Sequence, residues 1–151
     1  MGLKICLLSS AGGHLTELMR LDEAFTGHEH FYVTFEREDS VNVLKGRKVY
    51  FIKDPKRNPL KLLVNMVQSL RITIKERPDV IITTGAGVAV PMCLFGRLAG
   101  RKIVFIESFC RIGEKSLTGR MLYPVSDMFL VQWPETKEAY GGKARYEGAV
   151  L

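Results

Sequence analysis

The sequence predicts an α/β fold in which helices cover both faces of a parallel β-sheet. Two observations support this class: short apolar runs alternate with helical patterns along the chain, and several runs are apolar at every position. A parallel strand that is covered on both faces needs apolar side chains on both faces, so its sequence does not alternate with polar residues. The 151 residues contain no linker, repeat or low-complexity tract, and we expect one domain over residues 1–151.

Six strands are expected where β-branched, aliphatic and aromatic residues lie between turn or polar residues. The expected strands are residues 3–8, 31–35, 49–52, 80–83, 103–106 and 128–131. Helical patterns fall between them, with Gly27 at the stop position of the first helix and prolines before and after the second. The expected helices are residues 15–25, 59–77, 88–98, 116–122 and 134–140. This order predicts a Rossmann-like, doubly wound parallel sheet.

The chain is basic, with a net charge of +6. Basic chains bind nucleic acids, anionic membranes or phosphorylated ligands. The chain has no helix-turn-helix, zinc-finger or RNA-binding signature, so no nucleic-acid partner is expected. Cys6, Cys93 and Cys110 have neither a zinc nor a disulfide spacing, and we expect a reducing cytoplasm. The chain also has no Asp-x-Asp motif for a metal-bound nucleotide, so no metal or cofactor is expected. No stretch reaches the roughly 18 apolar residues of a membrane span, so membrane contact is expected only at the surface.

A glycine turn links the first strand to the first helix as Ser9-Ser10-Ala11-Gly12-Gly13-His14. In a doubly wound sheet this turn lies at the carboxyl ends of the strands, where ligands bind. Ser10, Gly12 and Gly13 are candidate substrate contacts, because glycines let the backbone approach a ligand closely. His14 is a candidate base for a sugar hydroxyl. A tight turn with a histidine that caps the helix is the alternative.

Two further turns are expected at the same edge of the sheet. Gly85 and Gly87 follow the fourth strand, where they are candidate substrate contacts or residues of a simple turn. Glu107 and Ser108 close the fifth strand, and a carboxylate beside a hydroxyl can bind sugar hydroxyls or act as a base. Arg111 belongs to a basic loop suited to a diphosphate. The alternative for Glu107 is a helix cap or an ion pair with Arg111.

The helix expected over residues 59–77 combines a broad apolar stripe with basic flanks. A helix that lies in a bilayer interface has this pattern, with its apolar face inserted and its cations near anionic headgroups. The expected membrane contacts are Arg57, Leu60, Lys61, Leu63, Val64, Val67 and Arg71. The alternative is ordinary packing of the apolar stripe on the sheet.

Several motifs in the chain resemble one family. They are the glycine turn followed by Leu15-Thr16-Glu17, the run at 106–111, and the runs at 116–120, 122–124 and 127–133. Together they are similar to the family that includes the acceptor-side, membrane-anchoring subunit of the dolichol-pathway N-acetylglucosaminyltransferase and its bacterial capsule and exopolysaccharide relatives. A more distant resemblance, carried by residues 78–80, 85–87 and Pro91, is to the N-terminal half of the peptidoglycan glycosyltransferase that makes lipid II.

The resemblance implies the N-terminal half of a GT-B glycosyltransferase, whose active site lies between this chain and a separate donor-binding subunit. This chain would hold a prenyl-diphosphate-linked sugar acceptor, and the partner would bring the UDP-sugar. His14 would be the base in an inverting displacement, and Glu107 would compete for that role or orient the substrate. The expected partner interface is Gln132, Trp133, Val150 and Leu151. The chain starts at its first strand, so peripheral attachment to the cytoplasmic face of the membrane is expected.

Two other functions are compatible with the sequence. A non-catalytic scaffold would recruit and activate a separate glycosyltransferase subunit at the membrane, and it would tolerate replacement of His14 and Glu107. An independent nucleotide-binding enzyme would bind UDP or NAD alone, but the Gly-x-Gly-x-x-Gly spacing of dinucleotide sites is missing from the first turn.

Overall fold

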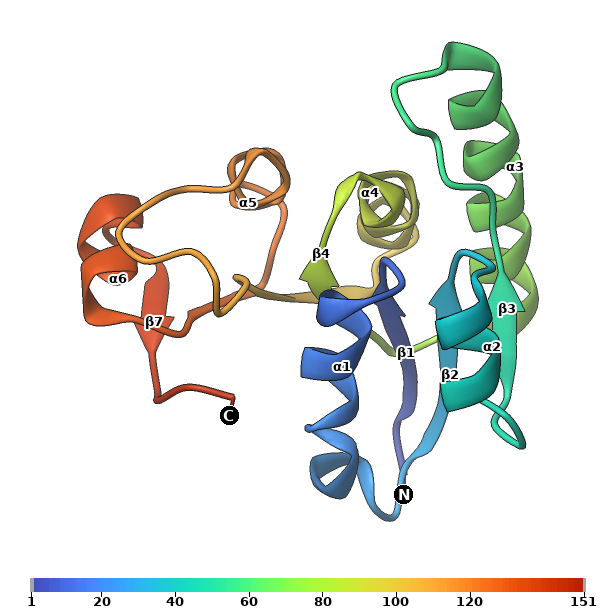
Figure 1. Ribbon diagram of the computed structural model, residues 1–151, viewed down its shortest axis with the longest axis horizontal. Helices are drawn as coiled ribbons and strands as arrows, with labels where there is room; N and C mark the ends of the chain where they lie inside the picture. Colours follow the sequence, from blue (N-terminus) through green and yellow to red (C-terminus); the bar gives the residue numbers. More distant parts are fainter. Residues whose placement is uncertain (1, 151) are drawn as a thin grey trace.

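The computed structural model describes residues 2–150. Its seven strands form one sheet in the order β3-β2-β1-β4-β5-β6-β7, and every neighbouring pair is parallel. From β1 the chain proceeds outward through β2 and β3, then returns to place β4 on the other side of β1 (Figure 1). The predicted doubly wound sheet is confirmed, with its switch point between β1 and β4.

All six predicted strands are present, with ends shifted by no more than two residues. The strands are β1 Lys4–Ser9, β2 Glu29–Thr34, β3 Val49–Phe51, β4 Val80–Gly85, β5 Lys102–Ile106, β6 Met128–Val131 and β7 Ala144–Tyr146. The seventh strand, β7, was not predicted. It lies at the edge of the sheet and buries only Ala144, so its sequence carries no apolar run.

The helices also follow the prediction, with two differences. They are α1 Gly13–Met19, α2 Glu38–Val43, α3 Pro59–Glu76, α4 Val90–Leu98, α5 Leu117–Leu122 and α6 Pro134–Tyr140. The first predicted helix is wrong beyond Met19, because the chain turns there and Phe25 belongs to a separate 3-10 helix. The short helix α2 was missed, because it buries only Ser40 and therefore shows no apolar stripe.

The core consists of two apolar clusters, one on each face of the sheet. Cys6 and Leu8 of β1 face the cluster that includes residues of α3, α4 and α5, whereas Ile5 and Leu7 face the cluster beneath α1 and the end of α2. All four side chains are buried. This two-sided burial explains why the strand sequence is apolar at every position.

Helix α3 packs with its polar face inward. Asn65, Ser69 and Thr73 are buried, and Asn65 Nδ2 donates a hydrogen bond to the carbonyl of Lys53 at 2.8 Å. The apolar stripe faces outward, with Leu60 73% and Leu63 58% exposed. The alternative in which this stripe packs on the sheet is therefore wrong. No helix within residues 2–150 is long and apolar enough to cross a bilayer.

A buried carboxylate ties the amino-terminal ends of the strands together, away from the ligand edge. Glu76, near the end of α3, pairs with Lys4 at 2.7 Å and with Lys48 at 2.8 Å, and it accepts a hydrogen bond from the Tyr50 hydroxyl. Burial opposes ionisation of Glu76, but these donors outweigh it and lower the pKa of the carboxyl to about 2.

Candidate functional site

The two predicted glycine turns meet at the switch point of the sheet. Ser9 at the end of β1 lies beside Gly85 at the end of β4. Gly12 and Gly85 have φ of +89° and +106°, a region that favours glycine. The position of a Cβ atom on Gly85 lies 3.9 Å from Cε1 of His14, so the histidine ring lies beside the end of β4.

A cleft of about 380 Å³ opens at this point, a size suited to a small ligand. Its lining includes both catalytic candidates and four of the predicted substrate contacts. The lining residues are Gly13, His14, Glu17, Thr84, Gly85, Ala86, Glu107, Ser108, Cys110, Arg111, Ser116, Leu117 and Thr118. Ser10, Gly12 and Gly87 do not line the cleft: Ser10 is buried, and Gly87 is exposed at the start of a 3-10 helix.

His14, the second residue of α1, is half-buried in this cleft. Its carbonyl accepts a hydrogen bond of 2.7 Å from the Thr84 hydroxyl, which links α1 to β4. Its ring atom Nδ1 is buried and has no hydrogen-bond partner within residues 2–150. The interpretation of His14 as a helix cap is wrong, because Gly12 occupies the N-cap and no side chain caps the helix.

Glu17 is a cleft residue that the sequence analysis did not select. It follows His14 by one turn of α1, and its Oε1 accepts hydrogen bonds from Ser108 Oγ at 3.1 Å and from the Phe109 N–H at 3.2 Å. Its Oε2 is buried and has no partner within the described chain. The i, i+3 spacing from His14 was the available signal, because it places both side chains on one face of the helix.

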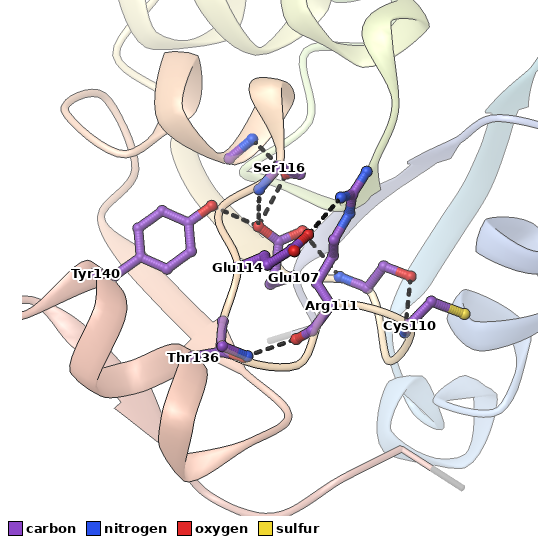
Figure 2. A network of polar contacts seen from close by, with 10 residues as sticks. Glu107, Cys110, Arg111, Glu114, Ser116, Thr136 and Tyr140 are labelled. Carbon is purple, nitrogen blue, oxygen red and sulfur yellow. Dashed lines mark hydrogen bonds and ion pairs between the residues drawn. The ribbon is translucent and has the colours of Figure 1, made fainter.

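Glu107 is buried, and its carboxylate is occupied by donors of the protein itself. Oε1 accepts from the Ser108 N–H at 3.1 Å, and Oε2 accepts from the Ser116 hydroxyl at 2.9 Å, the Ser116 N–H at 3.2 Å and the Tyr140 hydroxyl at 2.5 Å. Figure 2 shows the carboxylate between Ser116 and Tyr140. Burial and the bond to Glu107 raise the pKa of Tyr140 well above its ordinary value.

The expected ion pair between Glu107 and Arg111 is wrong. The Arg111 guanidinium instead pairs with Glu114 at 3.3 Å, on the exposed part of the loop (Figure 2). Glu107 caps α5 indirectly, because it fixes Ser116, whose Oγ accepts the Gly119 N–H at 2.8 Å. A Cβ atom on Gly119 would approach Glu107 Oε2 to 2.5 Å, so this packing requires a glycine.

Two of the predicted partner contacts act within the chain. Gln132 is 2% exposed; its Nε2 donates to the Glu107 carbonyl at 3.0 Å, and its Oε1 accepts from the Val150 N–H at 2.8 Å. Gln132 therefore supports the C-terminal segment and offers no surface of its own. Trp133 is half-buried and donates to the Phe109 carbonyl at 2.7 Å. Val150 is half-buried, and Leu151 lies outside the described residues.

The sheet order defines a Rossmann-like domain, equivalent to the N-terminal half of a GT-B fold, with the cleft at its switch point. The chain is similar to MurG of Acinetobacter baumannii (TM-score 0.81, 16% identity), covering 97% of this chain and 45% of that one. It is also similar to UDP-N-acetylglucosamine 2-epimerase of Rickettsia bellii (TM-score 0.77, 12% identity), over 99% of this chain and 45% of the epimerase chain. The chain thus spans just under half the length of these two structures, and the likeness concerns the fold.

The chain belongs to the family described as "Oligosaccharide biosynthesis protein Alg14 like", whose model matches residues 36–150. It is 29% identical to UDP-N-acetylglucosamine transferase subunit ALG14 of Homo sapiens over 99% of this chain and 83% of that protein. It is 47% identical to the subunit alg14 of Schizosaccharomyces pombe over 48% of this chain and 37% of that protein. The resemblance inferred from the motifs is confirmed.

Proposed function

We propose that the chain is the acceptor-binding, membrane-associating subunit of a two-component inverting glycosyltransferase. It would transfer a sugar from a UDP-sugar to a prenyl-diphosphate-linked saccharide during glycan or polysaccharide assembly. The observation that carries this proposal is the cleft at the switch point, where His14 lines a ligand-sized space between two glycine turns. The names of the relatives, which are transferase subunits, support the division into two components.

His14 acts as the general base in this proposal. Its neutral imidazole takes the proton of the acceptor hydroxyl while the hydroxyl oxygen attacks the anomeric carbon of the donor sugar. The bond from that carbon to UDP breaks, UDP leaves with the bonding electron pair, and the configuration at the carbon inverts. Glu107 is assigned a positioning role instead, because a substrate hydroxyl would have to displace donors that its carboxylate already holds.

The remaining predicted contacts fit this arrangement as neighbours of the acceptor. Gly13, Gly85 and Ser108 line the cleft beside His14, and Ser10, Gly12 and Gly87 shape the two turns. Arg111 lies at the exposed rim, where its guanidinium can exchange Glu114 for a phosphate. We assign it to the diphosphate of the UDP-sugar, which the donor-binding partner would present across the cleft. Trp133, Val150 and Leu151 are proposed to lie near that partner.

Helix α3 is proposed to rest on the cytoplasmic face of the membrane. The support is its inverted packing: Leu60, Leu63 and Val67 face outward, whereas the buried side is polar. Exposed Arg57 and Arg71 flank the apolar stripe, and basic residues near an anionic surface each contribute about 1 kcal/mol to binding.

Transfer of labelled sugar tests the proposal. Membranes that contain a prenyl-diphosphate-linked acceptor are supplied with UDP-N-acetylglucosamine and with this chain, the candidate partner, or both. Transfer by the mixture alone, abolished by His14→Ala while the two proteins still co-purify, is the expected result. Full transfer by the partner alone, or by the mixture with His14→Ala, would identify the chain as a scaffold.

A further inference from the structure

A second pocket lies at the carboxyl ends of β2 and β3, beside the first half of α3. It also has a volume of about 380 Å³, and four cations line it: Arg37, Lys53, Lys56 and Lys61. One Nη atom of Arg37 lies 3.8 Å from the position of a Cβ atom on Gly12, and the next residue, Gly13, lines the cleft of His14. The Arg37 side chain therefore reaches from the lining of this pocket to the glycine turn beside the cleft.

The pocket has an excess of positive charge that the protein does not neutralise. Within residues 2–150, no carboxylate lies within 4.0 Å of the ammonium groups of Lys53, Lys56 or Lys61. The acids of the lining are Glu36 and Asp54, and Asp54 accepts a hydrogen bond from the Lys56 N–H at 3.3 Å. Arg37 pairs with Asp39 through Nε, which leaves its other nitrogens available. The lining thus holds four cations and two carboxylates, and this excess of positive charge favours an anionic ligand.

Hydrogen bonds to side chains of α3 fix the backbone of Lys53. The Lys53 N–H donates to Gln68 Oε1 at 2.7 Å, and the Lys53 carbonyl accepts from Asn65 of the same helix. Lys56 and Arg57 have φ of 41° and 57°, a left-handed conformation that side chains rarely adopt. The connection from β3 to α3 is thus anchored at Lys53 to the helix whose apolar face is exposed.

We propose that this pocket binds the diphosphate of the lipid-linked acceptor. The proposal rests on the proposed function, and it adds where the lipid, the diphosphate and the sugar of the acceptor each contact the protein. The exposed apolar face of α3 would contact the bilayer, the basic pocket adjoins the start of α3, and the Gly12 turn leads to the cleft of His14. A prenyl-diphosphate saccharide has the same sequence of lipid, diphosphate and sugar. A phospholipid headgroup has one phosphodiester and no group that would continue into the cleft.

Vesicle binding by the purified full chain tests the pocket. The probes are phosphatidylcholine vesicles that contain either geranylgeranyl diphosphate or phosphatidylglycerol, at matched surface charge. The variant Lys53→Gln/Lys56→Gln removes two pocket charges and leaves Lys61 on α3. The variant Lys45→Gln/Lys137→Gln removes the same charge from exposed sites outside the pocket and is the control. Unchanged thermal unfolding establishes that both variants fold.

We expect the wild-type chain and the control to bind diphosphate vesicles more tightly than phosphatidylglycerol vesicles. The pocket variant should lose this preference, with affinity for diphosphate vesicles reduced by about tenfold or more, because each lysine removed takes away a charged hydrogen bond to the diphosphate. An equal loss on phosphatidylglycerol vesicles would overturn the proposal, since the lysines would then be general headgroup contacts. A retained preference would also overturn it. If the preference depends on the pocket but no sugar is transferred with any partner, the pocket stands and the proposed function fails.

Discussion

Replacement of Glu107 by glutamine tests whether this residue positions the cleft. The glutamine amide can keep its oxygen toward the hydroxyls of Ser116 and Tyr140. Its NH₂ group then faces the Ser108 N–H, which donates to Oε1 in the wild type, and two donors cannot form a hydrogen bond. One hydrogen bond to a charged group is then lost, worth about 1.5–3 kcal/mol, and the other three lose their charge assistance. Since the charge also costs free energy to bury, we expect Glu107→Gln to lower the free energy of unfolding by about 2–3 kcal/mol.

Urea denaturation monitored by circular dichroism measures this loss. Glu114→Gln is the matched control, because its carboxylate forms an exposed pair with Arg111 and should contribute less than about 1 kcal/mol. Equal stability of the two variants would refute the positioning role. If Glu107→Gln folds with wild-type stability and still abolishes transfer, Glu107 is the base and the assignment of His14 fails.

Three further outcomes are expected. His14→Ala should change the free energy of unfolding by less than about 0.5 kcal/mol, because Nδ1 has no partner to lose, yet lower the rate of transfer by about 10²–10⁴-fold; marked destabilisation would show a structural role. Leu63→Gln/Val67→Gln should reduce vesicle binding and leave thermal unfolding unchanged, whereas a lower melting temperature would show that the stripe packs within the protein. Because the folded-state pKa of Glu76 is depressed from 4.5 to about 2, its contribution is complete above pH 4.5 and is lost as the pH falls toward 2. In Glu76→Gln, the free energy of unfolding should therefore fall less between pH 4.5 and pH 2, by at most about 3 kcal/mol. The same pH dependence in the variant and the wild type would contradict this.

The sheet could be predicted because its signal is local. Strands buried on both faces must be apolar throughout, so β1, β4 and β5 are visible as continuous runs. The glycine turns were predictable for a similar reason, since the doubly wound order alone places them at one edge. Helix α2 and strand β7 were missed because each buries too few side chains to leave a pattern.

The contacts that build the cleft could not be predicted, because they join distant parts of the chain. Glu17 meets Ser108 across 91 positions, and the role of Glu107 depends on Tyr140, which is 33 positions away. Which face of α3 is buried could not be predicted from the sequence, for another reason. An amphipathic pattern identifies two faces, but only the burial of Asn65, Ser69 and Thr73 in the structure shows that the polar face is the inner one.

In α3, the stability of the fold and the affinity of the protein for an apolar phase depend on different side chains. Asn65, Ile72 and Glu76 hold the helix on the domain through a hydrogen bond, core packing and ion pairs. The outward leucines and valines contribute little to folding in water because they remain largely exposed. Their transfer free energy, on the order of 5–10 kcal/mol for six such side chains, is realised only when another apolar phase covers them. Substitutions on this face would therefore alter the partition coefficient of the protein and leave its melting curve unaffected.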